Sequence, residues 1–150
     1  MSKPAENTLQ AATVLCRGTA RYLRALGFSV VSEFPLASGR RADLVGIGAA
    51  GEIVIVEVKS CVADFRADGK WREYREFCDR FFFAVAADFP QALIPEEAGL
   101  VVADGYGAEM IRDNEYRPLP AARRKALSIR IARCAADRLA GILDPAGGPI

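Results

Sequence analysis

The sequence predicts an α/β protein built on a mixed central β-sheet that is flanked by helices. Apolar residues recur at three- and four-residue spacing near both ends of the chain, which is typical of amphipathic helices. Between them, the run from Ile53 to Val56 is apolar on both faces, as expected of a central strand that is covered on two sides. With 150 residues, 51% of them hydrophobic, the chain favours one folded domain over residues 1–150.

The expected elements begin with a helix from Leu9 to Leu26, whose apolar face includes both of these leucines, and Gly27 ends it. Three strands are then predicted at Phe28–Phe34, Arg41–Ile47 and Glu52–Ser60. Asp68 is the expected N-cap of a helix from Lys70 to Cys78, and a buried strand follows at Phe81–Ala86. This order of elements is αβββαβ.

The last third of the chain is expected to add two short strands and a long helix. The strands are Leu100–Ala103 and Glu109–Arg112. Pro120 opens the helix, and Leu127, Ile131 and Leu139 are expected to face the core. We expect residues 143–150 to form a flexible tail.

Composition excludes several kinds of chemistry. The chain has no histidine, so it cannot use a Ser-His-Asp or Cys-His nucleophile system. Its four cysteines form no CxxC pair, and we expect them to be reduced thiols. No signal-type segment and no apolar run of about 20 residues is present, so we expect a cytoplasmic protein with no membrane partner.

One glycine pattern matches a nucleotide-binding fingerprint by its letters alone. Gly46, Gly48 and Gly51 fit GxGxxG, but that motif requires the glycines to lead into a helix. Here they lead into the apolar strand after Glu52. The pattern therefore indicates a hairpin, and no nucleotide cofactor is expected.

The strongest chemical signal lies on both sides of this hairpin. Glu57 and Lys59 share one face of a strand because strand side chains alternate, and the hairpin brings Asp43 alongside them. Two carboxylates beside an ammonium suit a hard divalent cation such as Mg²⁺ or Mn²⁺. A structural network of ion pairs between Asp43, Lys59 and Glu57 is the alternative.

These residues carry a resemblance to two protein groups. Asp43 followed by Glu57-Val58-Lys59 resembles the PD-(D/E)XK signature of nucleases that share a restriction endonuclease-like αβββαβ core. A closer match, over nearly the whole chain, is to the MmcB family of bacterial DNA repair proteins. The segments that carry it include Gly39-Arg40-Arg41-Ala42-Asp43-Leu44, Val56-Glu57-Val58-Lys59-Ser60, Asp64-Phe65-Arg66-Ala67-Asp68 and Val102-Ala103-Asp104-Gly105-Tyr106-Gly107.

The resemblance implies a metal-dependent DNA nuclease. Asp43, Glu57 and the Val58 carbonyl would hold Mg²⁺ or Mn²⁺, and Lys59 would orient the attacking water. Many superfamily members place a glutamate in the first helix, whereas Asn7 to Ser32 contains no acid. Either Glu33 in the first strand replaces it, or the site is incomplete.

Two more residues resemble a motif of repair exonucleases. Lys70 and Tyr74 resemble its QxxxY pattern, and their spacing of one helical turn would let both face the site. The alternative is that Tyr74 simply packs its helix on the sheet.

DNA and other DNA-repair proteins are the expected partners. Arg40 and Arg41 precede Asp43 closely and should lie beside the acidic pocket, where they would attract phosphate. The alternative for these two arginines is a solvated turn or a salt bridge to Glu33 or Glu52. Arg123, Arg124, Lys125 and Arg130 on the last helix would extend this contact, unless they form only a solvated helix face. The rival to a nuclease is a non-catalytic DNA-binding or scaffold module that keeps the nuclease fold.

Overall fold

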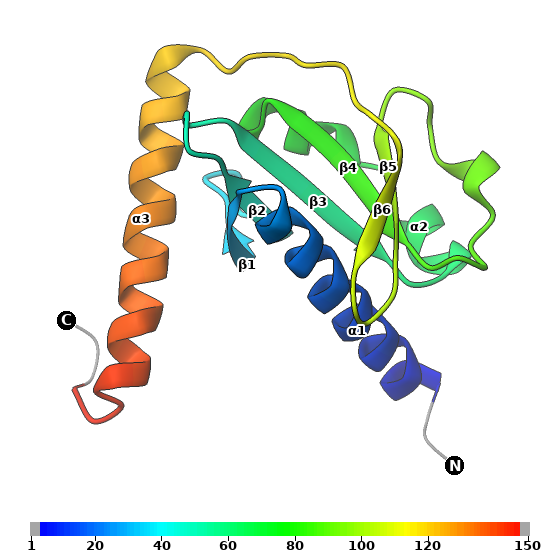
Figure 1. Cartoon of the computed structure of the whole chain (residues 1–150), viewed down its shortest axis with the longest axis horizontal. Helices are drawn as coiled ribbons and strands as arrows, with labels where there is room; N and C mark the ends of the chain where they lie inside the picture. Colours follow the sequence, from blue (N-terminus) through cyan, green and yellow to red (C-terminus); the bar gives the residue numbers. More distant parts are fainter. Residues whose placement is uncertain (1–3, 148–150) are drawn as a thin grey trace.

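A six-stranded mixed sheet forms the centre of the protein, for which a computed structural model describes residues 4–147 (Figure 1). The strands lie side by side in sequence order: β1 (Ser29–Pro35), β2 (Arg41–Ile47), β3 (Ile53–Lys59), β4 (Arg80–Val85), β5 (Gly99–Ala103) and β6 (Ala108–Arg112). The three central strands β3, β4 and β5 are parallel, and the remaining neighbours pair antiparallel. The predicted α/β class with a mixed sheet is confirmed.

Helices cover both faces of the sheet. Helix α1 (Pro4–Ala25) crosses one face, and helix α3 (Ala121–Leu143) packs with the 3-10 helix η1 (Trp71–Phe77) on the other (Figure 1). All seven residues of β3 are buried. Ile53 and Ile55 belong to the core under α3, and Val54 and Val56 belong to the core under α1, as strand alternation requires.

The segment predicted as a helix from Lys70 to Cys78 is the shorter 3-10 helix η1, and Asp68 is not its N-cap. Lys70 holds that position without a side-chain cap, and Asp68 instead ends a helix α2 (Val62–Ala67) that the sequence pattern missed. Helix α2 has no buried residue, so its sequence lacks the apolar periodicity that would have predicted a helix. A second 3-10 turn, η2, covers Gln91–Leu93.

Three leucines that were expected to face the core are exposed instead: Leu9, Leu26 and Leu139. Leu9 and Leu139 lie near the ends of the long helices α1 and α3, whose ends extend past the sheet (Figure 1), and Leu26 lies in the turn after α1 ends at Ala25. Periodicity identifies the apolar face of a helix, but it does not say how far the sheet beneath it reaches. Of the predicted tail, residue 143 still ends α3, and residues 148–150 lie outside the described part.

The hairpin predicted at Gly46 to Gly51 is confirmed. The Gly48 N–H donates to the Glu52 carbonyl at 2.8 Å, and Gly51 adopts a φ of 89°, a left-handed conformation that glycine accommodates. The glycines lead directly into β3, so the fingerprint lacks the helix that would hold a pyrophosphate.

Asp79, just before β4, ties α3 to the start of the sheet. Its carboxylate is buried and accepts the N–H groups of Ile53 and Leu119, each at 2.8 Å. It also accepts two hydrogen bonds of 2.6 Å from the Arg124 guanidinium. Every oxygen of this buried acid is therefore satisfied and its charge is neutralised.

No helix within residues 4–147 is long and apolar enough to cross a membrane.

Candidate functional site

The candidate site lies where the pairing of β2 with β3 ends. The ladder between these strands stops at the Leu44–Val56 pair. Beyond it, the Asp43 N–H donates to Glu57 Oε1 at 2.9 Å, and the Val58 N–H donates to Asp43 Oδ2 at 2.8 Å. Since buried backbone donors need partners, these two crossed bonds orient both carboxylates between the strands. The two side chains also hydrogen-bond to each other.

The two carboxyl groups are in direct contact, and Glu57 is buried while Asp43 is half-buried. Glu57 is only 5% exposed, and burial, followed by the negative charge of Asp43, raises its pKa to about 9. Burial likewise raises the pKa of Asp43. Two adjacent carboxylates in a desolvated site cannot both stay ionised without a compensating cation. The pair therefore holds either a shared proton or a bound cation.

Lys59 ends β3 and is 7% exposed. Its ammonium Nζ lies 3.0 Å from Asp68 Oδ2, so α2 supplies its ion-pair partner. Its charge still lowers the pKa values of Asp43 and Glu57, although burial outweighs this effect. Lys59 is thus held at the site by a third acid rather than by the carboxyl pair itself.

These groups line a pocket of about 270 Å³ beneath α1. Its walls come from α1, from the ends of β2 and β3, and from the segment that leads into α2: Thr8, Leu9, Ala12, Cys16, Asp43, Glu57, Val58, Lys59, Ser60 and Asp64. The prediction that Asp43, Glu57 and Lys59 converge on one pocket is therefore confirmed. Their roles in catalysis and metal binding stay predictions.

The donors of this pocket fit a hard cation. In a strand, the N–H and carbonyl of one residue point to the same side, and the Val58 N–H points to Asp43. The Val58 carbonyl therefore faces the same side. Among the described side chains of residues 7–147, no three His, Cys, Asp or Glu residues form a metal-binding group. A cation would thus take the Asp43 and Glu57 carboxylates, this carbonyl and water, a donor set that suits Mg²⁺, which keeps several waters.

Two residues of the pocket were not singled out from the sequence. Asp64, on α2, lines the pocket, and its charge adds to the effect of burial in raising the pKa of Asp43. Ser60 Oγ is buried in the described structure without a hydrogen-bond partner. Asp64 stood within a segment that carries the family resemblance, but that segment has no helical periodicity to place it at the site.

Glu33 does not line the pocket. It is exposed on edge strand β1, opposite Asp43 between two paired positions, and its φ is 47°, a left-handed value rare for a non-glycine residue. Arg138 of α3 holds this strained backbone by donating to the Glu33 carbonyl at 2.7 Å. That Glu33 touches a metal-bound water stays a prediction.

Tyr74 and Lys70 do not enter the pocket either. Tyr74 is buried against Phe81 with stacked rings 5.9 Å apart, and its hydroxyl donates to the Arg41 carbonyl at 3.2 Å. Lys70 is exposed. This arrangement favours the packing alternative for Tyr74. Cys16 does line the pocket, but burial and the charges of the acids raise the pKa of its thiol to about 12, so it stays protonated.

Of the two arginines before Asp43, one is engaged within the protein. The Arg40 guanidinium donates to Glu73 at 2.7 Å and lies over the ring of Tyr74. Arg41, the first residue of β2, is exposed. Arg41 is therefore the freer of the two to meet a phosphate.

The basic residues of α3 lie on the side of the sheet away from α1. Arg124 is committed to Asp79, as described above. Arg123 and Arg130 donate to the backbone carbonyls of Glu76 and Pro35, and Lys125 is exposed. Because α1 covers the acidic pocket on the opposite face, α3 does not simply extend that pocket.

The fold and site thus define an α/β protein with an acid pair at a strand end, and comparison with known proteins places it further. Residues 2–146 match the family described as DNA repair protein MmcB-like, and the chain belongs to this family. A solved structure, the SPO1766 protein of unknown function from Silicibacter pomeroyi, is similar at 49% sequence identity with a TM-score of 0.90. The match covers 94% of this chain and 97% of that one. No functionally curated protein matches.

Proposed function

We propose that this protein is a divalent-metal-dependent deoxyribonuclease of the PD-(D/E)XK type that acts in DNA repair. The observation that carries the proposal is the pair of half-buried Asp43 and buried Glu57, cross-bonded at the end of β3 and sharing a pocket with Lys59. Membership of the MmcB-like family supports the role in DNA repair. The order α1-β1-β2-β3-α2-β4 supports a restriction endonuclease-like core.

The residues suit phosphodiester hydrolysis. In this reaction a water oxygen attacks phosphorus, one P–O ester bond breaks, and the proton from water ends on solvent or on the leaving oxygen. A bound Mg²⁺ or Mn²⁺ would supply charge stabilisation, held by Asp43, Glu57 and the Val58 carbonyl. Lys59 orients the attacking water and offsets negative charge that grows on the phosphoryl oxygens.

The ion pair between Lys59 and Asp68 serves this role. A lysine side chain has four rotatable bonds, and its contact with Asp68 at 3.0 Å restricts it to the pocket wall. Three N–H donors on the ammonium leave at least one for a water or a phosphate. Asp68 is therefore a positioning residue in this proposal.

DNA would approach the pocket with its phosphates. Because bare carboxylates repel phosphates, cations near the pocket are needed for this contact. Arg41 is exposed two residues before Asp43 and is the cation best placed for this contact, with Arg40 behind it. Contacts of this kind carry little base information, so binding should be weakly sequence-dependent and strongly salt-dependent.

The test combines metal binding with cleavage. Calorimetric titration with Mn²⁺ should show binding in the wild type and none in Glu57→Gln, while Glu96→Gln, a control at an exposed acid, binds normally. In Mn²⁺, labelled single-stranded, duplex, nicked and flapped DNA should include a substrate that the wild type cleaves and Lys59→Met does not. Equal cleavage by wild type and Lys59→Met would assign the activity to a contaminant.

One observation favours a non-catalytic DNA-binding module as the second candidate. The described α1 side chains that line the pocket, at positions 8, 9, 12 and 16, include no acid, and Glu33 lies outside the lining. DNA binding that persists in EDTA, together with no Mn²⁺ binding to the wild type, would favour this candidate.

A further inference from the structure

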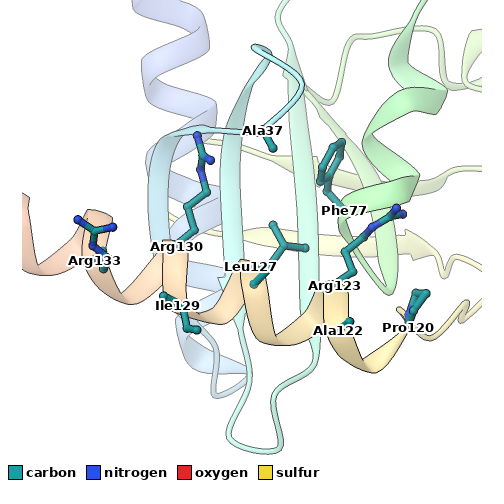
Figure 2. A pocket seen from close by; sticks show the side chains of 10 residues that line it. Ala37, Phe77, Pro120, Ala122, Arg123, Leu127, Ile129, Arg130 and Arg133 are labelled. Atoms are coloured by element: carbon teal, nitrogen blue, oxygen red, sulfur yellow. The ribbon is translucent and has the colours of Figure 1, made fainter.

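A groove of about 890 Å³ along α3 is larger than the acidic pocket of about 270 Å³. Its lining is mostly apolar and combines α3 with the turn after β1 and the end of η1: Ala37, Phe77, Pro120, Ala122, Arg123, Ala126, Leu127, Ile129, Arg130 and Arg133. Figure 2 shows Arg123 and Arg130 extending from α3 on either side of Leu127, toward Phe77 and Ala37. Its size lies within the range of ligand-binding clefts.

The charge in this groove has one sign. Arg123, Arg130 and Arg133 line it and no lining residue is acidic. Among the described side chains of residues 7–147, none of the three forms an ion pair with a carboxylate. Backbone carbonyls fix two of them: Arg123 Nη1 donates to Glu76 at 3.1 Å and Arg130 Nε to Pro35 at 2.8 Å. A guanidinium has five N–H donors, so both keep donors for a ligand.

We propose that this groove binds a helical segment of a protein partner, apolar along one face and acidic on its flanks. Apolar anchors spaced at i, i+4 and i+7 would cover Leu127, Phe77 and the alanines, because burial of apolar surface favours association. Flanking glutamates would pair with the arginines. From Arg123 to Arg133 is ten residues of helix, about 15 Å, so a partner helix of roughly 10 to 14 residues matches the groove.

An acidic peptide fits this surface better than DNA does. Seven of the ten lining residues are apolar, and a phosphate backbone has no apolar surface to cover them. The groove also lies on the face of the sheet opposite α1, whereas the acidic pocket lies beneath α1. A partner bound here would leave that pocket accessible, and the inference does not depend on nuclease activity.

The test uses the full chain in EDTA and two fluorescent helical peptides of 14 residues. Both carry leucine at i, i+4 and i+7, and they differ in having glutamate or lysine at all flanking positions. Fluorescence anisotropy should show binding of the glutamate peptide only, with an affinity that falls as salt rises. A 20-base-pair DNA duplex serves as competitor.

Two alanines of α3 give a matched pair of variants. Ala126 and Ala132 are both exposed on the same helix, but only Ala126 lines the groove. Ala126→Glu puts bulk and a carboxylate between Arg123 and Arg130, three and four residues away. It should therefore lower the affinity for the glutamate peptide at least tenfold. Ala132→Glu adds the same group elsewhere and should change affinity less than about twofold. Circular dichroism checks that both variants are folded.

Several results would overturn the proposal. Equal binding of the two peptides would show that the arginines do not select an acidic partner. An equal loss of affinity in Ala126→Glu and Ala132→Glu would show that the peptide does not bind in the groove. If the duplex displaces the peptide from the wild type, and Ala126→Glu also weakens binding of the duplex, the groove would be assigned to nucleic acid. If light scattering shows that the wild type self-associates and Ala126→Glu does not, a second copy of this chain is the occupant.

Discussion

Replacing Glu57 by glutamine should stabilise the metal-free protein at neutral and alkaline pH. Burial and the contact with Asp43 raise the pKa of Glu57 to about 9, from an ordinary value of 4.5. Between pH 4.5 and about pH 9, therefore, Glu57 keeps its proton in the folded state but has released it in the unfolded chain. A raised carboxyl pKa contributes most stability below pH 4.5, and this contribution declines as the pH rises towards 9.

The magnitude follows from the size of this shift. Each pH unit above 4.5 costs about 1.4 kcal/mol of unfolding free energy for one proton, so at pH 7.5 the cost is on the order of 2 to 4 kcal/mol. Glutamine removes the titration, and its Oε1 can still accept the Asp43 N–H that Glu57 accepts at 2.9 Å. The variant should gain roughly this free energy at pH 7.5 and nothing at pH 4.5.

Urea denaturation in EDTA, from pH 4.5 to 8.5, measures this difference. Glu96→Gln, at an exposed acid, is the control and should follow the wild type at every pH. Saturating Mn²⁺ should then offset most of this difference, since a ligand at 100 times its Kd adds about 2.7 kcal/mol to a protein that binds it. If Glu57→Gln is no more stable than the wild type at pH 8, Glu57 ionises without penalty and the reasoning fails.

Three further outcomes are expected. Mn²⁺ affinity, measured by calorimetry, should rise with pH up to about 9, because Glu57 must lose its proton to bind the cation; a flat profile would contradict this. Asp79→Asn should lower the free energy of unfolding by about 3 to 5 kcal/mol in urea, because it leaves the Arg124 charge without its buried partner; a loss below 1 kcal/mol would count against that role. Alanine at Arg40 and Arg41 should reduce the slope of log K against log salt for DNA by roughly one unit per lost phosphate contact, and an unchanged slope would remove both from the interface.

The sequence predicted the sheet well because its signals are local. The apolar run of β3 and the glycine hairpin each reflect a few adjacent residues, and alternation then placed Glu57 and Lys59 on one face. The convergence of Asp43 with them required only that β2 and β3 form a hairpin. This part of the site could therefore be predicted without knowing the rest of the fold.

The parts of the site that depend on tertiary packing were not predictable in the same way. Helix α2 buries no residue, so Asp64 and the ion pair of Asp68 with Lys59 had no periodic pattern to reveal them. Arg124 sits among other basic residues in sequence, and nothing local distinguishes it as the partner of Asp79, 45 positions away. Charge clusters show how many cations a segment has, but not which of them the fold already uses.

Acidic side chains lie near both ends of β3, but their partners differ. This contrast bears on whether Asp43, Glu57 and Lys59 form only a structural network of ion pairs. At the start, the Asp79 carboxylate is neutralised by Arg124 through two bonds of 2.6 Å. At the end, no described side chain forms an ion pair with the two carboxyl groups, because Lys59, although its charge is near enough to lower their pKa values, is directed to Asp68. A purely structural network would be expected to resemble the first arrangement. An uncompensated pair costs stability, and such a cost is typical of a site that takes its cation from solution.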